Sequence, residues 1–171
     1  MDIYEAIKKR RSVRAYKDKK IDEAVLNKIL EAARLAPSAH NSQEYKFVVV
    51  KNAAKRKALA KAALDQKFIG EAPVVIAAVS LNPEHIMTCE VPAHAVDVAI
   101  ALDHLTLAAV EENLATCWIG AFNQEEVKRI LNIPEKYKVV ALMPLGVPND
   151  KPRPKRRKDL KQLVCKEKFF E

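Results

Sequence analysis

The apolar positions of the chain follow two patterns, which together predict alternating helices and strands. Apolar residues at helical spacing predict helices over residues 3–10, 23–36, 53–64, 93–113 and 124–131. Continuous apolar runs predict core strands over residues 46–50, 73–79, 116–119 and 139–146. This alternation leaves the fold class open between α/β and α+β.

Two of these elements carry information about packing. The run at 73–79 is apolar on both faces, which predicts a central strand. The helix at 93–113 is apolar on nearly every side, so it is expected to be buried or to pack against another chain. We interpret it as the central helix and as a dimer contact. Since no apolar run reaches about 18 residues, the sequence indicates no transmembrane span.

The positive charge of the chain is concentrated at its two ends. The formal net charge is +8; residues 1–20 hold 8 basic and 3 acidic side chains, and residues 151–171 hold 9 and 3. Two basic ends can converge on one anionic ligand or remain two solvated tails, and charge alone does not decide between them. A nucleic-acid-binding protein is a third class, but the excess of acidic side chains in the middle and the 6% aromatic content argue against it.

The three cysteines are Cys89, Cys117 and Cys165, an odd number without a close-spaced pair. This pattern is no disulfide framework and is typical of a reducing compartment, so we expect a cytoplasmic protein. The segment 1–5 does not have the charged-then-apolar pattern of a signal peptide. Cys117 stands in an apolar strand beside Trp118, and we expect a buried thiol there rather than a nucleophile.

Candidate chemistry begins in the segment Arg10–Arg14, which holds three guanidinium groups and one hydroxyl within five residues. A planar guanidinium offers a fork of donors that fits a phosphate group. The alternative is a solvated basic turn. A second polar segment, 37–43, offers uncharged donors and acceptors; in it, His40 is either a ligand-facing donor or an exposed loop residue.

Several familiar site types have no motif in this chain. With three glycines it can form neither a P-loop nor a glycine-rich dinucleotide turn, and it has no Gly-x-Ser-x-Gly sequence. His85, Cys89 and His94 lack the tight pairs of a zinc site, so we expect no metal. No catalytic dyad or triad is visible. That pattern fits a protein whose chemistry belongs to a bound cofactor.

Five segments, in order along almost the whole chain, resemble the nitroreductase family of FMN-dependent oxidoreductases. They are Ile7–Tyr16 (IKKRRSVRAY), Ala36–Gln43 (APSAHNSQ), Ala72-Pro73 before a core strand, Cys117–Phe122 (CWIGAF) and the basic tail. The resemblance implies that FMN is reduced by NADH or NADPH, and that the nicotinamide leaves before a nitroaromatic, quinone or similar acceptor enters, a ping-pong mechanism. No catalytic side chain is implied, because N5 of the flavin carries the chemistry.

The same resemblance implies cofactor-binding residues. The phosphate and the ribityl chain are assigned to Arg10, Ser12 and Arg14 with Arg11 alongside, and Lys155 and Arg157 complete the phosphate site from the tail. The loop against the flavin, usually supplied by the partner subunit, corresponds to Ser38, Ala39, His40, Asn41 and Gln43. Ile119 and Gly120 correspond to the backbone near N5, and Gln66 is a further candidate for the pyrimidine edge.

The implied fold is α+β, with a mixed, mostly antiparallel sheet flanked by helices in a domain-exchanged homodimer. Two FMN sites then lie at the subunit interface. Residues 1–171 are expected to form one FMN-binding domain, with 147–171 as an extended basic arm that packs on the partner subunit. The apolar helix at 93–113 and the apolar end of the tail, Phe169 and Phe170, agree with this arrangement.

Two departures from the family pattern leave the electron acceptor open. Asn113-Leu114-Ala115 stands where the family often has glycines, and residues 81–91 form a short connection where larger members insert helices. The flavin face is therefore expected to be more open. The alternatives are a specialised flavoenzyme of the same family, for example a reductive dehalogenase or a flavin-fragmenting enzyme, and a flavin-binding protein without this turnover.

Overall fold

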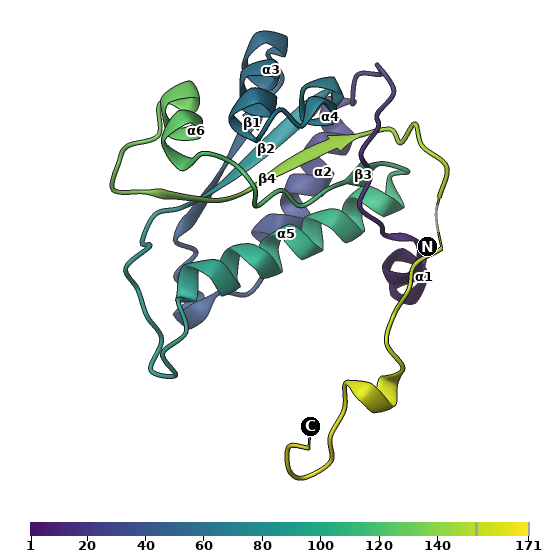
Figure 1. Cartoon of the computed structure of the whole chain (residues 1–171), viewed down its shortest axis with the longest axis vertical. Coiled ribbons are helices and arrows are strands. Elements are labelled where there is room, and N and C mark those ends of the chain that lie inside the picture. Colours follow the sequence, from purple (N-terminus) through teal and green to yellow (C-terminus); the bar gives the residue numbers. More distant parts are fainter. Residues whose placement is uncertain (153, 171) are drawn as a thin grey trace.

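The computed structural model describes residues 1–152 and 154–170, and within this part four strands form one antiparallel sheet in the order β1-β2-β4-β3 (Figure 1). The strands are β1 Tyr45–Val50, β2 Val74–Ser80, β3 Ala115–Thr116 and β4 Lys138–Gly146. In the β1–β2 pair Val50 lies opposite Val75, and in the β2–β4 pair Val74 lies opposite Leu145. The strand pairs are antiparallel, so the fold class is α+β, as the sequence analysis predicted.

The helices lie on both faces of this sheet. They are α1 Ile3–Lys9, α2 Glu23–Arg34, α3 Ala53–Ala62, α4 Lys67–Glu71, α5 Ala93–Glu111 and α6 Gln124–Leu131, with short 3₁₀ turns η1 Ala39–Asn41 and η2 Leu160–Gln162. One apolar cluster joins α2 and α5 to residues such as Ile76 and Met143. A second joins α3, α4 and α6 to residues such as Val75 and Leu142. Successive strand residues point to opposite faces, so each strand supplies both clusters.

Four of the helices begin directly after a side chain that caps them. The side chains of Asp2, Asp22, Asn52 and Asn123 each accept a hydrogen bond from a main-chain N–H group in the first turn of the helix that follows. The structure also contains the helix α4, which the sequence analysis did not predict because the helix is too short for an apolar period to be recognised.

Two predictions about strands need correction. The run at 46–50 was expected to be a buried strand, but β1 lies at the sheet edge and, of its six residues, Val50 is the buried one. The strand predicted over 116–119 corresponds to β3, which covers Ala115–Thr116. Ile119 lies outside β3 and pairs with Leu142 as an isolated bridge. By contrast, all seven residues of β2 are buried, so the prediction of a central strand is confirmed.

The helix α5 packs on α2 and on the sheet and passes along the whole layer (Figure 1). Eight of its residues are buried, among them Val98, Leu102 and Leu105. Its length and composition would suffice to cross a membrane, but its buried face belongs to the core. The prediction of a central helix is therefore confirmed.

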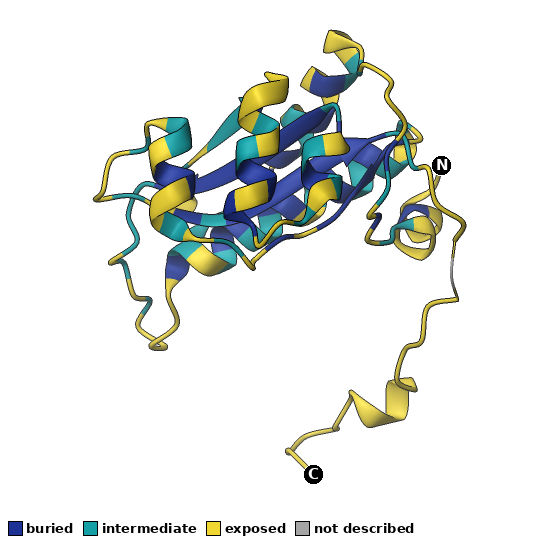
Figure 2. Ribbon diagram, turned by 45° about the horizontal axis from the view of Figure 1, so that its top comes forward, coloured by how far each residue is buried: buried dark blue, intermediate teal, exposed yellow. Residues whose placement is uncertain are grey.

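The C-terminal arm leaves the body, and its described residues from Asn149 to Phe170 are exposed (Figure 2). Arg153 and Glu171, which belong to the arm predicted from the sequence, lie outside the described residues. The arm carries large apolar side chains into solvent, including Leu160 at 75% exposure and Phe169 at 82%.

Candidate functional site

The segment Arg10–Arg14 is held in an extended conformation beside β3. The helix α1 ends at Lys9, and the ψ of 129° at its C-cap residue Arg10 turns the chain out of the helix. Ser12 then forms a parallel bridge with Thr116, and the N–H of Val13 donates to the carbonyl of Thr116 at 3.0 Å. Because successive side chains of extended backbone alternate in direction, the fully buried Val13 leaves Ser12 and Arg14 facing outward.

The beginning of the C-terminal arm runs antiparallel to this segment. Tyr16 bridges Pro148, and the N–H of Asn149 donates to the carbonyl of Ala15 at 2.9 Å. Next along the arm, both oxygens of Asp150 accept hydrogen bonds of 2.7 Å from the fork of Arg11. The two basic ends of the chain therefore converge, which decides against two independent solvated tails.

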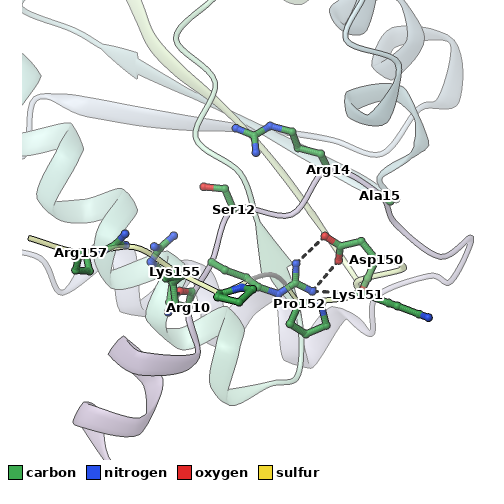
Figure 3. A pocket seen from close by; sticks show the side chains of 11 residues that line it. Arg10, Ser12, Arg14, Ala15, Asp150, Lys151, Pro152, Lys155 and Arg157 are labelled. Atoms are coloured by element: carbon green, nitrogen blue, oxygen red, sulfur yellow. Dashed lines mark hydrogen bonds and ion pairs between the residues drawn. The ribbon is translucent and has the colours of Figure 1, made fainter.

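The converging ends enclose a cavity of about 780 Å³ (Figure 3). Its charged lining residues are Arg10, Arg11, Arg14, Asp150, Lys151, Lys155 and Arg157. Figure 3 shows the hydroxyl of Ser12 between the guanidinium of Arg14 on one side and the group formed by Arg10 and Lys155 on the other. Six cations around one carboxylate repel one another, so the cavity favours an anion.

The cations of this cavity are not equivalent. Arg11 is occupied by Asp150, and this hydrogen bond raises the pKa of the guanidinium. Within the described chain, no hydrogen bond or ion pair engages the side chains of Arg10 and Arg14. Desolvation, followed by the charges of nearby arginines, lowers the pKa of Lys155. Arg10 and Arg14 therefore keep all their side-chain donors, whereas the fork of Arg11 is used by Asp150.

A second cavity of about 310 Å³ adjoins the first, since Arg10 and Ser12 line both. Its other lining residues are Ala99, Leu102, Asp103 and Thr106 of α5, with Thr116, Trp118 and Met143. Trp118 is 43% exposed. The preceding residue, Cys117, is buried, and burial raises the pKa of this thiol although Arg14 and the Ser12 hydroxyl act in the opposite direction. Cys117 is thus a buried thiol, as expected.

The neighbouring residues Ile119 and Gly120 differ in how their main-chain groups are hydrogen-bonded. Ile119 exchanges both main-chain hydrogen bonds with Leu142, at 2.9 and 3.0 Å. Within the described chain no hydrogen bond uses the N–H of Gly120, which is exposed. The amide of Gln66 donates to the carbonyl of Ala121 at 3.3 Å. Gln66 and the free amide of Gly120 are therefore neighbours, whereas the Ile119 amide is already used inside the sheet.

The loop Ser38–Gln43 lies at the opposite end of α5 from the basic cavity. The N–H of Ala39 donates to Asp97 in the second turn of that helix, at 2.9 Å. Asp103 and Thr106, further along α5, line the cavity shared with Arg10 and Ser12. Within one chain the loop residues predicted to contact the cofactor are therefore not brought to the arginine cluster.

The three residues weighed as a metal site do not form one. Among the described residues no group of three His, Cys, Asp or Glu side chains is arranged around a common point. His85 instead lies 4.0 Å from Glu44, measured from Nδ1 to Oε2, and Glu44 accepts from Asn82.

Three residues at the site were not identified from the sequence. Trp118 forms a wall of the second cavity, Asp150 fixes the fork of Arg11, and Asp97 holds the loop at Ala39. The neighbouring motif could have drawn attention to Trp118. Asp97 and Asp150 act through contacts 58 and 139 residues away in the sequence, and no local pattern indicates such contacts.

Comparison with known proteins yields one family. The profile of the nitroreductase family matches residues 7–80 and 63–147. A Methanothermobacter thermautotrophicus protein assigned as NADH dehydrogenase/NAD(P)H nitroreductase is 32% identical over 162 residues, covering 89% of this chain and 80% of its own length. The FMN reductase [NAD(P)H] of Bacillus subtilis is 28% identical, covering 91% and 70%. An iodotyrosine deiodinase of Thermotoga neapolitana is 25% identical, covering 90% and 91%.

Solved structures agree with this result. A nitroreductase family protein from Clostridium novyi NT is 39% identical with a TM-score of 0.82, covering 88% of this chain and 87% of that one. The NADPH:FMN oxidoreductase from Vibrio harveyi, solved with NAD⁺, has a TM-score of 0.90 at 26% identity, covering 99% and 78%.

Proposed function

The chain belongs to the nitroreductase family, and we propose that it works as a homodimer that reduces a nitroaromatic, a quinone or a similar acceptor by a ping-pong mechanism. It is an NAD(P)H-dependent oxidoreductase with FMN as its cofactor. When bound, FMN would supply the hydride and electron transfer between the nicotinamide and the acceptor. The side chains of the protein bind and orient the two reactants.

The observation that carries this proposal is the set of uncompensated cations in the larger cavity. Arg10 and Arg14 have free donors, and Arg157 lines the same cavity while one of its guanidinium nitrogens donates to the carbonyl of Arg156. Two of the three donors of the Lys155 ammonium are used by main-chain carbonyls, which leaves one for a ligand. A dianionic phosphate group fits such a site, because charge-assisted hydrogen bonds are roughly twice as strong as neutral ones.

The flavin ring is assigned to the segment Trp118–Gly120, which continues from the basic cavity past Ser12. The free N–H of Gly120 offers a donor to the ring, and the glycine lets the backbone approach it closely. We also assign Gln66 to the pyrimidine edge; its Nε2 donates to the carbonyls of Ala63 and Ala121, so its side-chain oxygen is the group that can accept from the ring. Because Ile119 turns its amide to Leu142, we assign Ile119 a packing contact rather than a hydrogen bond.

Assembly from two subunits explains the separation of the two halves of the site. Asp97, which holds the loop Ser38–Gln43, and Thr106, beside the arginines, are nine residues apart on α5, or roughly 14 Å at 1.5 Å per residue. Antiparallel packing of two α5 helices brings the loop of one subunit to the arginines of the other.

Exposed apolar side chains support the same assembly. On α1, Ile3, Tyr4 and Ile7 are 57%, 71% and 50% exposed. Leu163 and Phe169 of the arm are likewise exposed. Large apolar groups on an extended arm have no core to join within their own chain, so we assign the arm to the surface of the partner subunit. Residues 1–171 then form one FMN-binding domain whose arm starts at 147.

The cytoplasm is the compartment we propose. Cys89, Cys117 and Cys165 are free thiols, and Cys89 and Cys165 are exposed. Exposed free thiols are typical of a reducing environment.

The experiment that tests the function is an anaerobic titration. Purified protein is expected to be yellow or to become yellow with FMN, and NADH or NADPH should bleach the flavin band. Protein that binds no FMN contradicts the proposal, and bound FMN that neither nucleotide bleaches indicates a flavin-binding protein without turnover. Turnover with a nitroaromatic, a quinone and a halogenated phenol then identifies the acceptor class, with parallel initial-rate lines expected for a ping-pong mechanism.

A further inference from the structure

The carboxylate of Asp97 is buried between α5 and the loop Ser38–Gln43. Its residue is 5% exposed, and Oδ1 accepts the N–H of Ala39 at 2.9 Å. In the described chain this is its one hydrogen bond to another residue. A charge withdrawn from water is unfavourable unless its partners compensate for it, so a buried aspartate with so few partners requires a reason.

The loop that Asp97 contacts has an unusual backbone. His40, Asn41 and Gln43 have φ angles of 52°, 55° and 52°, in the left-handed region that residues other than glycine rarely adopt. Such conformations persist when the surroundings over-determine them, and they concentrate at ligand sites. In this loop the surroundings must therefore fix the backbone.

Most of the bonds that fix this loop are internal to it. Ser38 Oγ accepts the N–H of Gln43 at 3.0 Å, and Gln43 Nε2 donates to Asn41 at 3.2 Å. The bond from Ala39 to Asp97 is different, because it joins the loop to α5 in the core. Asp97 therefore sets where the strained loop sits relative to the rest of the subunit.

Three other buried polar groups belong to β1, β2 and the first turn of α5. The hydroxyl of Tyr45, the hydroxyl of Ser80 and Nδ1 of His94 are buried without a hydrogen-bond partner in the described chain. Tyr45 and Ser80 are directly opposite each other in β1 and β2, and His94 precedes Asp97 by three residues on α5. Burial raises the pKa of Tyr45 and lowers the pKa of His94, and the charge of Asp97 is a smaller influence that acts upward on both.

An apolar side chain at position 97 would remove the buried charge and its desolvation, and would also remove the connection to Ala39. The buried carboxylate is accounted for if the position of the loop matters more to the protein than the stability lost by burying a charge.

We propose that Asp97 is a positioning residue for the cofactor site. Its carboxylate holds the loop Ser38–Gln43 in the conformation in which that loop contacts FMN bound to the partner subunit. This inference rests on the proposed function. It adds a residue that no sequence motif contains and that acts on the cofactor through Ala39 across the subunit interface.

The test uses three variants of the full-length dimer. Asp97→Ala removes the acceptor, Asp97→Asn keeps an oxygen that can accept from Ala39, and Ala39→Pro removes the donor while leaving Asp97 in place. Proline suits position 39, because Ala39 begins a 3₁₀ turn in helical geometry after an extended Ser38. Glu126→Ala, on the exposed first turn of α6, is the control.

The expected result separates positioning from folding. Asp97→Ala and Ala39→Pro should weaken FMN binding at least tenfold and alter the visible flavin spectrum, while Asp97→Asn stays within about threefold of the wild type. Hydrogen exchange at the Ala39 amide of the apoprotein should accelerate in Asp97→Ala and stay slow in Asp97→Asn. The urea midpoints of the apoproteins should fall less than the FMN affinity does.

Each other outcome overturns the inference. If the wild type binds FMN and Asp97→Ala binds it equally tightly, the proposed function stands and the positioning role is wrong. If Asp97→Asn loses as much affinity as Asp97→Ala, the charge matters rather than the bond to Ala39. If the apoprotein of Asp97→Ala or Ala39→Pro is unfolded, the residue is structural. Wild-type protein that binds no FMN overturns the proposed function together with this inference.

Discussion

The ammonium group of Lys155 donates a hydrogen bond of 2.7 Å to the carbonyl oxygen of Arg10 and a second bond to the carbonyl of Lys8. These carbonyls belong to the C-terminal end of α1, where main-chain acceptors lack helical partners and a cation is favourable. The contact fastens the C-terminal arm to the turn from which Arg10 enters the cavity. Residues 145 positions apart in the sequence thus form one wall of the anion site.

Replacement of Lys155 by methionine is expected to weaken FMN binding at least about tenfold. Methionine keeps the apolar stem but loses the cation and both carbonyl contacts, and a hydrogen bond to a charged group contributes roughly 1.5–3 kcal/mol. FMN binding can be followed by quenching of Trp118, the one tryptophan of the chain. Lys161→Met, in the exposed turn η2, is the control. Equal affinities in the two variants would contradict the role of Lys155.

Two glycines should respond differently to substitution by alanine. A Cβ at Gly146 would lie 2.6 Å from Cδ of Pro73 and 3.0 Å from the ring of Tyr16, so Gly146→Ala should lower the unfolding free energy by about 1–3 kcal/mol. A Cβ at Gly120 meets no atom closer than 3.8 Å, and Gly120→Ala should leave the apoprotein stable.

The alanine at position 120 is nevertheless expected to weaken FMN binding severalfold, because in the proposed site its methyl group would stand where the ring approaches the free N–H. Urea unfolding of the apoproteins and FMN titration measure the two effects separately. Unchanged FMN affinity in Gly120→Ala would place the ring elsewhere.

The buried Tyr16 makes the folded state sensitive to alkaline pH. Its hydroxyl donates to the carbonyl of Val13 at 2.8 Å, and burial raises the pKa of the phenol well above its ordinary value of 10.0. The folded state therefore keeps the proton where the unfolded chain releases it. The stabilisation is complete below about pH 10 and declines above it, by up to roughly 1.4 kcal/mol per pH unit.

Tyr16→Phe should be less stable than the wild type at neutral pH, by about 1 kcal/mol for the lost hydrogen bond. Because phenylalanine cannot ionise, this difference should shrink as the pH rises from 9 to 11.5. Urea unfolding at several pH values measures it, with the exposed Tyr4→Phe as the control. A constant difference across this pH range would show that Tyr16 does not remain protonated in the folded state.

The sequence indicated most of the fold because its local signals agree with the packing. Asp2, Asp22, Asn52 and Asn123 cap helices that also bury an apolar face. The prediction that β1 is a buried strand was wrong, since an apolar run does not show whether a strand has one neighbouring strand or two. The short α4 was missed, because five residues are too few to establish a helical period.

The site was indicated less completely than the fold. Charge at the two chain ends pointed to an anion site, and the structure brings those ends together through Tyr16 and Pro148. Sequence alone could not separate Arg11 from its neighbours, because the difference lies in the bond to Asp150, 139 residues away. Nor could it find Asp97, whose effect depends on the three-dimensional position of Ala39.

Mixed dimers should reveal whether the two halves of the site come from different subunits. One chain carries Arg10→Ala/Arg14→Ala and the other carries Asn41→Ala/Gln43→Ala, and each variant is expected to be inactive as a homodimer. In the mixed dimer one site receives both sets of changes, while the other combines intact arginines with an intact loop. Two affinity tags allow the mixed species to be purified.

The purified mixed dimer is expected to bind one FMN and to oxidise NADH or NADPH at about half the wild-type rate per dimer. If arginines and loop of the same chain formed each site, both sites of the mixed dimer would carry a defect and activity would stay near zero. A mixture of each variant with itself, refolded in the same way, is the control. Recovery of activity in the mixed dimer is expected because the loop is held at Asp97 and the arginines lie beside Thr106, roughly 14 Å further along α5. A second chain, packed antiparallel on the first, can bring its loop to those arginines.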